Sequence, residues 1–184
     1  MSSRSAGLFL LTLVTACGER PGADRRASTG DSLRSVADAS TTDTSTTDIT
    51  LYFTDAYELQ VADCGAVLPA PRVVPDSLAT PGHVLRLLLA GVTPAERAAG
   101  MSSQFHPTPG VGTDRALVDF LLGIEVNHGT AYLDFSPGAL AYLNNAACLQ
   151  GAVKQPIIRT LTTFPGIDRV RFRISGEIFE DWDA

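Results

Sequence analysis

A stretch near the middle of the chain decides the fold, and it reads LLGIEVNHGTAYLDF from Leu121 to Phe135. Two runs rich in apolar residues, 121–126 and 130–135, flank Asn127-His128-Gly129, where the glycine suits the positive φ of a tight turn. Alternate positions of the second run share one face, and on the apolar face they are Ala131, Leu133 and Phe135. The stretch therefore predicts a β-hairpin that turns one face toward a core.

Toward the C-terminus, strict polar/apolar alternation from Arg169 to Ile174 predicts another strand. Its apolar positions face the core, and its polar positions present three arginines on the opposite face, Arg169, Arg171 and Arg173. Two helices are expected between the hairpin and this strand. One is capped at Ser136, and the other begins at Gln155 or Pro156, because a proline deeper in a helix costs about 3 kcal/mol.

Toward the N-terminus, β-branched and aromatic residues predict a strand over Ile49–Thr54, and prolines bound an extended segment over Pro71–Pro75. Thr80-Pro81 is typical of the N-cap and first residue of a helix, which Gly91 would end. The stretch Thr93-Pro94-Ala95-Glu96 has the spacing of a capping box and predicts one further helical turn.

Together these elements predict an α/β (α+β) fold in a single small domain. Its sheet would be mixed or antiparallel, with about four strands and with two or three helices packed on one face. We place this domain at residues 49–176 and an acidic tail at residues 177–184. The length of 184 residues suits one domain plus some unstructured sequence.

The first residues are expected to be a targeting segment and no part of the fold. Arg4 precedes an apolar run over Ala6–Val14, and the following Thr15-Ala16-Cys17 completes a sequence that resembles a lipobox. The run is too short to span a bilayer, which needs about 20 apolar residues. We expect residues 1–16 to be a lipoprotein signal peptide and Cys17 to carry the lipid. The alternatives are an ordinary signal peptide or a short apolar helix of the fold.

Residues 17–48 are expected to be the lipidated cysteine and a disordered tether rich in Ser, Thr and Asp. After Cys17 this segment has no aromatic residue, and its only large aliphatics are Leu33 and Val36. Such a composition buries too little apolar surface to offset the entropy lost on ordering. Glycosylation of the Ser/Thr tract is the alternative reading.

Five segments of the chain occur in the order of a known family. They are Leu51-Tyr52-Phe53, Arg72-Val73-Val74, Leu88–Glu96, Gly129–Ser136 and Arg159–Val170. In this order they resemble the GerMN domain, the sporulation and spore germination domain of many bacterial lipoproteins, over about residues 49–176. Two positions depart from the family pattern: Val92 stands where proline is usual, and Pro156 where an apolar residue is commoner. The resemblance implies an envelope, sporulation or signalling-associated role and no reaction.

Two cysteines remain if Cys17 is acylated. Cys64 follows the first strand, and Cys148 is expected near the end of the helix that Ser136 caps. An even number of cysteines suits an oxidising compartment, and the family resemblance implies that these two pair. Two buried thiols are the alternative.

The sequence offers no pattern for catalysis, for a cofactor or for a metal. The histidines, His83, His106 and His128, have no Cys, His or carboxylate at metal-ligand spacing. The acidic tail matches no calcium loop, and neither a nucleophile elbow nor a nucleotide-binding glycine pattern occurs. A formal net charge of −6 and a pI of about 4.9 disfavour binding to nucleic acid.

We therefore expect a non-catalytic, extracytoplasmic lipoprotein, held to the membrane by its lipid anchor. It would act as a protein-interaction or assembly module at the cell envelope, meeting another envelope protein or copies of itself. The alternative is a lipoprotein that binds a small ligand or a cell-wall polymer. Arg169, Arg171 and Arg173 are the candidate partner surface, unless Glu125, Asp134 or the acidic tail pairs with them across the sheet.

Overall fold

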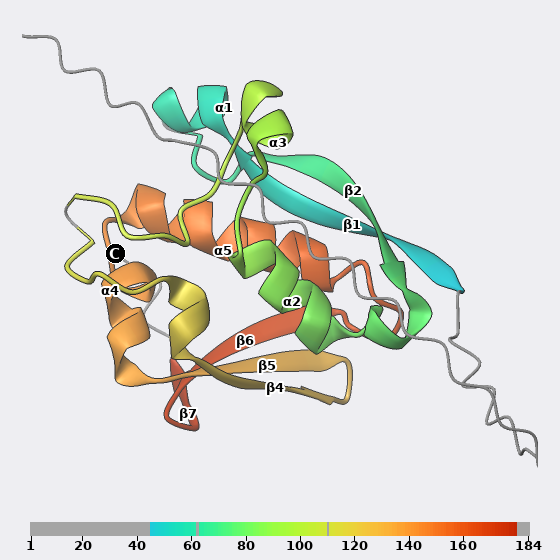
Figure 1. The fold of residues 1–184 in the computed structure, drawn as a ribbon. Helices are drawn as coiled ribbons and strands as arrows, with labels where there is room; N and C mark the ends of the chain where they lie inside the picture. The colour runs from blue at the N-terminus through green and yellow to red at the C-terminus, as the bar shows by residue number, and fades with distance from the viewer. Residues whose placement is uncertain (1–44, 62, 110, 180–184) are drawn as a thin grey trace, which may run out of the picture. The chain divides into compact units, whose positions relative to one another are not determined.

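The computed structural model of the protein describes residues 45–61, 63–109 and 111–179, which belong to one compact unit. Within these residues the chain forms seven strands, arranged as two sheets, and five α-helices (Figure 1). The predicted signal peptide, Cys17 and most of the predicted tether lie outside the described residues.

The first sheet has three strands in the order β2-β1-β3, all antiparallel. They are β1 (Thr46–Asp55), β2 (Val67–Pro75) and β3 (Met101–Ser102). The predicted strand is confirmed, but it begins three residues before Ile49, so Thr46–Asp48 belong to the sheet and not to the tether. The extended segment predicted at Pro71–Pro75 is the second half of β2.

The second sheet has four strands in the order β4-β5-β6-β7. They are β4 (Leu121–Asn127), β5 (Thr130–Phe135), β6 (Arg169–Ile174) and β7 (Glu177–Phe179). The predicted hairpin is confirmed, and both residues of its turn have positive φ, 46° at His128 and 76° at Gly129. Because β5 and β6 run parallel and the other pairs antiparallel, the sheet is mixed. The prediction of an acidic tail from Glu177 is wrong for its first three residues, which form β7.

The α-helices are α1 (Ala56–Gln60), α2 (Pro81–Leu89), α3 (Pro94–Ala98), α4 (Leu140–Leu143) and α5 (Ala147–Leu161). The caps predicted at Thr80 and Thr93 are confirmed, because the hydroxyl of Thr80 accepts a hydrogen bond from the N–H of His83 and Thr93 forms a capping box with Glu96. Ser136 precedes a helical turn as predicted, but its side chain makes no capping hydrogen bond. After Ser136 the chain makes a short 3₁₀ turn before α4. Cys148 is the second residue of α5. The prediction that it lies near the end of the helix that follows Ser136 is therefore wrong.

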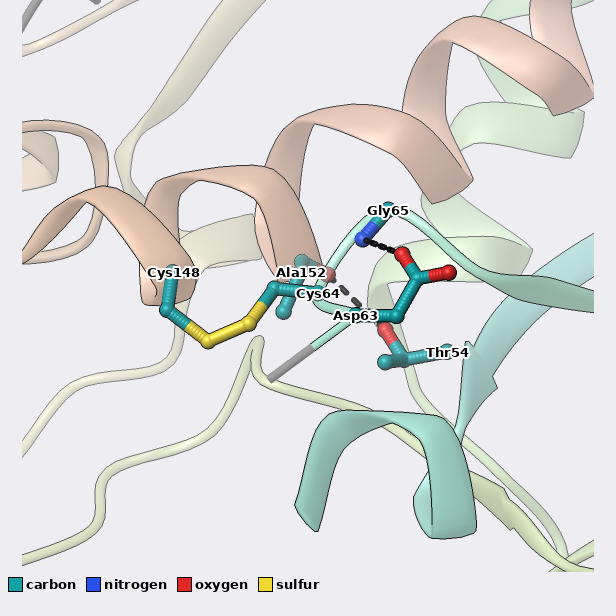
Figure 2. Close-up of a disulfide and its surroundings, with 6 residues drawn as sticks. All are labelled: Thr54, Asp63, Cys64, Gly65, Cys148 and Ala152. Atoms are coloured by element: carbon teal, nitrogen blue, oxygen red, sulfur yellow. Dashed lines mark hydrogen bonds between the residues drawn. A yellow bond between two sulfur atoms is a disulfide. The ribbon is translucent and has the colours of Figure 1, made fainter. Parts of the chain in front are cut away.

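The start predicted for the last helix is wrong, because α5 begins at Ala147 and contains Pro156 in its interior. A proline has no N–H, so the carbonyl of Ala152, four residues earlier, loses its helical partner. The buried hydroxyl of Thr54 on β1 donates a hydrogen bond to this carbonyl at 3.0 Å (Figure 2). The orphaned acceptor is thus satisfied from a strand 98 residues away in the sequence.

Helices α2 and α5 contact both sheets and lie between them (Figure 1). The α+β class is confirmed, but the prediction of a single sheet is wrong. The strand predicted over Ile49–Thr54 belongs to a separate three-stranded sheet, and β7 completes the four-stranded one. The core between these layers is aliphatic and aromatic. Its fully buried members include Leu51, Phe53, Leu85, Leu88, Leu133, Phe135, Ile157 and Leu161. The opposite face of the four-stranded sheet carries polar and charged side chains.

Candidate functional site

We call this opposite face of the four-stranded sheet the outer face; it comprises the side chains that β4–β7 turn away from the core. Glu125 and Tyr132 are paired neighbours on β4 and β5, and Arg173 lies on the next strand. Arg173 Nη1 lies 2.9 Å from Glu125 Oε2, and its guanidinium carbon lies 3.9 Å from the centroid of the Tyr132 ring. An ion pair and a cation–π contact therefore fix these three side chains as one ordered cluster.

Two exposed apolar side chains accompany this cluster. Leu122 on β4 is 59% exposed, and Ile178, which pairs with Arg173, is 43% exposed. The register of β4 and β5 shifts between Leu121 and Gly123, and this bulge turns Leu122 outward. A shallow hollow of about 240 Å³ lies beside the cluster and includes Leu122 and Tyr132 in its lining. The outer face thus combines apolar edges with a charged, aromatic centre.

Arg169, Arg171 and Arg173 lie at alternate positions of β6 and so share one face of the sheet, as predicted. Their interactions differ from one another. Arg169 and Arg171 are exposed, and Phe172 between Arg171 and Arg173 is buried. Arg173 forms the internal ion pair with Glu125, which was one of the two alternatives, and Arg171 is likewise engaged in an interaction. The three arginines are therefore not a uniform stripe of unpaired charge.

Asp134 has a structural role on this sheet. Its Oδ1 accepts a hydrogen bond from the N–H of Gly176 at 2.9 Å. Ser175 and Gly176, which connect β6 to β7, both have positive φ, 52° and 85°. Asp134 therefore holds the turn that adds β7, and with it Ile178, to the sheet.

Cys64 and Cys148 are joined in a disulfide, with their Cα atoms 5.1 Å apart (Figure 2). Close packing accompanies this bond, because a Cβ placed on Gly151 would lie 3.2 Å from the carbonyl oxygen of Cys64. The Oδ1 of Asp63 accepts a hydrogen bond from the N–H of Gly65, which shapes the loop that carries Cys64. The disulfide thus fastens the first turn of α5 to the loop that precedes β2.

Two residues of the family-like segments, Arg72 and Glu96, form an ion pair. Glu96 is almost fully buried and also accepts hydrogen bonds from the N–H and the hydroxyl of Thr93. The bonds from Arg72 and Thr93 lower the pKa of Glu96 to about 2, although burial opposes this shift. The pair joins β2 to α3, so these residues stabilise the fold and offer no reactive group.

His83 lies on α2, His106 in a loop and His128 in the hairpin turn. His106 Nε2 lies 3.0 Å from the carbonyl oxygen of Ala90, at the end of α2. Among residues 45–61, 63–109 and 111–179, no group of three His, Cys, Asp or Glu side chains could hold a metal ion. In the same part of the chain, no helix is both long and apolar enough to cross a membrane.

Sequence reasoning missed the apolar residues of the outer face. Leu122 was read as one more residue of a regular strand, although the doublet Leu121-Leu122 breaks the alternation and signals the bulge. The sequence places Ile178 in the acidic tail, because four acidic residues lie within five positions of it. The pairing of Glu125 with Arg173 was expected as one of several possibilities, and the contact with Tyr132 was not foreseen.

Comparison with known proteins gives consistent matches. The model of the family described as "Germane: Sporulation and spore germination" matches residues 50–180. The tandem GerMN domains of the sporulation protein GerM from Bacillus subtilis match with a TM-score of 0.51 and 25% identity, covering 76% of this chain and 43% of that one. The first GerMN domain of that protein matches with a TM-score of 0.49 and 24% identity, covering 72% of this chain and 86% of that one. The chain thus spans less than half of the tandem structure. No curated protein matches it.

Proposed function

Since the chain belongs to the Germane family of sporulation and spore germination domains, we propose that its domain is a non-catalytic docking module of the cell envelope. The outer face of the four-stranded sheet meets a partner protein or a second copy of the chain. The ion pair of Arg72 with Glu96 and the hydrogen bond that Asp134 accepts from the N–H of Gly176 both serve the fold.

The observation that carries this proposal is the composition of the outer face. Protein interfaces combine apolar and aromatic anchors with arginine, and this face carries all three kinds of side chain. Leu122 and Ile178 are the exposed apolar residues of this face, and Arg173 contacts both the carboxylate of Glu125 and the ring of Tyr132. A pre-ordered cluster of this kind loses little side-chain entropy on binding, which favours affinity.

The proposal includes a membrane anchor at Cys17. A diacylated cysteine binds a bilayer durably, because each buried CH₂ contributes about 0.8 kcal/mol. Residues 18–45 would separate the anchor from β1, which begins at Thr46. The domain would then work on the extracytoplasmic side, within reach of other envelope proteins.

Charge substitution on the outer face tests the proposal. We expect Leu122→Arg to reduce recovery of the chain in large complexes from detergent-solubilised native membranes, since a charge would be buried at the interface. The matched control is Val73→Arg on β2, because Val73 is 66% exposed but lies on the other sheet. The proposal fails if both variants behave as the unsubstituted chain does, or if both reduce recovery equally.

A further inference from the structure

A second feature lies away from the outer face, where α1, α3 and β3 meet. A hollow of about 250 Å³ is lined there by Ala56, Val92, Arg97, Met101, Ser102, Ser103 and His106. The lining includes three apolar side chains, from Ala56, Val92 and Met101, together with a guanidinium, two hydroxyls and an imidazole. No acidic side chain belongs to this lining, although the chain as a whole is acidic.

Arg97 is the charged group of the hollow. Its side chain is exposed on α3, and its guanidinium forms no hydrogen bond or ion pair with any residue that the structure describes. This separates it from Arg72 and Arg173, which both have carboxylate partners. Arg97 therefore keeps its donors available for an anion.

The hydrogen-bond partners of Ser102 and Ser103 determine whether each hydroxyl can donate to a ligand or accept from it. The hydroxyl of Ser103 accepts a hydrogen bond from the N–H of Phe105 at 3.4 Å, which leaves its own proton to donate. The hydroxyl of Ser102 donates to the carbonyl of Thr54 at 3.4 Å and can only accept from a ligand. One hydroxyl can therefore add to the donors of Arg97, while the other suits a protonated oxygen or a ligand hydroxyl.

The imidazole of His106 is held in a fixed orientation. Its Nε2 must donate to the carbonyl oxygen of Ala90, because that oxygen can only accept. The ring can lie this close to α2 only because Gly91 has no side chain; a Cβ there would stand 2.7 Å from Nε2. With φ at 86°, Gly91 also occupies a conformation that other residues rarely adopt. The wall of the hollow is thus formed before any ligand arrives.

We infer that this hollow binds a small phosphate-bearing ligand, with Arg97 and Ser103 donating to the phosphate oxygens. Phosphate accepts hydrogen bonds from several directions, which suits donors that come from α3 and from the segment after β3. The apolar side chains of the lining contact a short carbon group of the ligand. A volume of about 250 Å³ lies below the range usual for drug-sized ligands, so the hollow holds a headgroup or one monomer of a polymer.

Titration of the ¹⁵N-labelled full chain in neutral detergent micelles tests this site. Inorganic phosphate is the first probe, and the amide signals of Ser102, Ser103 and Phe105 report binding. We expect saturable shifts at these amides. Arg97→Gln should weaken binding about tenfold or more, as for the loss of a hydrogen bond to a charged group. The matched control is Arg86→Gln on α2, an exposed arginine outside the hollow, which should leave binding unchanged.

Flotation with vesicles separates the possible sources of the phosphate. Binding to phosphatidylglycerol and not to phosphatidylcholine vesicles, measured with Cys17→Ser and lost in Arg97→Gln, would assign the site to a lipid headgroup. Phosphate shifts without vesicle binding would assign it to a soluble or polymer-borne phosphate. The inference is overturned if phosphate causes no saturable shift and no vesicle binds, or if Arg86→Gln weakens binding as much as Arg97→Gln. Neither substitution touches the outer face, so this test is independent of the proposed docking role.

Discussion

At the scale of single residues, the hydrogen bond from Thr54 to Ala152 explains how a long helix tolerates Pro156. Proline removes one bond of the helix, and β1 replaces it. A second threonine makes a similar link, because the hydroxyl of Thr160 accepts from the N–H of Tyr52 at 2.9 Å. Both threonines are buried, and their hydroxyls join α5 to β1. A hydrophobic side chain at either position would leave the partner backbone group unpaired.

The loss of unfolding free energy caused by substitution of Thr54 should therefore depend on whether residue 156 is proline. Thr54→Val keeps the shape but leaves the Ala152 carbonyl without a donor, which should cost about 1–3 kcal/mol of unfolding free energy. In a Pro156→Ala background the helix regains its own N–H, and the same substitution should cost at least about 1 kcal/mol less. Denaturant unfolding of the four proteins measures this coupling, with Thr54→Ser as the control that retains the hydroxyl. Additive effects would show that the bond does not compensate for the proline.

The ion pair of Glu96 with Arg72 predicts a pH dependence. The pKa of Glu96 is lowered from 4.5 to about 2 in the folded protein. The contribution of this shift to the free energy of unfolding is at most roughly 3 kcal/mol. It is therefore fully present above pH 4.5 and is lost as the pH falls toward 2. Glu96→Gln should be less stable than the unsubstituted chain at pH 7, and the difference in unfolding free energy should shrink below pH 4.5. Glu177→Gln, at an exposed position, is the control; a difference that does not change with pH would contradict the assignment.

At the scale of elements, the sequence was informative wherever a local rule decided the structure. The caps at Thr80 and Thr93, the hairpin turn and the alternation of β6 all follow from neighbouring residues, and the structure confirms them. The start of α5 was mispredicted because the partner that rescues Pro156 lies 98 residues away from Ala152. Likewise, β3 has two residues and β7 three, and such strands exist only through their pairing.

The edge of the three-stranded sheet is poorly suited to pairing with another strand. The backbone N–H of Tyr52 donates to the hydroxyl of Thr160, so this N–H points away from β2. Its partner Pro69 therefore turns its nitrogen toward the open edge of β2, as does Pro71, two residues later. Prolines at these positions remove the donors that an added strand would need. Association through this edge is thus disfavoured, which agrees with docking through the outer face of the other sheet.

The disulfide should stabilise the domain by fastening α5 to the loop before β2. It closes a segment with a sequence separation of 84 residues, which on the chain-entropy model corresponds to about 4.5 kcal/mol. We expect a double Cys64→Ala, Cys148→Ala variant to unfold at a lower denaturant concentration. Thiol counting on the denatured, unreduced chain should find neither cysteine titratable. Two titratable thiols, or a double variant of equal stability, would contradict this role.

At the scale of the whole molecule, the Germane domain is expected to be tethered to a membrane through Cys17. Cys17→Ala should move the chain from the detergent phase to the aqueous phase on phase partitioning, because a cysteine-linked diacyl group is the proposed anchor. Cys64→Ala with Cys148→Ala is the control, since it removes two cysteines without touching the anchor and should stay in the detergent phase. Detergent partitioning that survives Cys17→Ala would exclude this anchor.

The fold and the functional surface were not equally predictable for the molecule as a whole. Periodicity and caps gave the α+β class and most elements of the Germane domain. The surface was harder, because Leu122, Tyr132 and Arg173 meet only when three strands are placed in register. The sequence indicated arginines on one face, whereas the structure adds the apolar and aromatic residues that make this face suitable for a partner.

Site-specific photocrosslinking in native membranes tests docking through the outer face most directly. A photoreactive phenylalanine analogue at Leu122 or Ile178 should form adducts of defined mass with one partner, whether another protein or a second copy of the chain. The same analogue at Val73 or Tyr57, which are also exposed but lie outside the four-stranded sheet, should form none. Equal adduct yields from all four positions, or adducts from Val73 and Tyr57 alone, would contradict docking through this face.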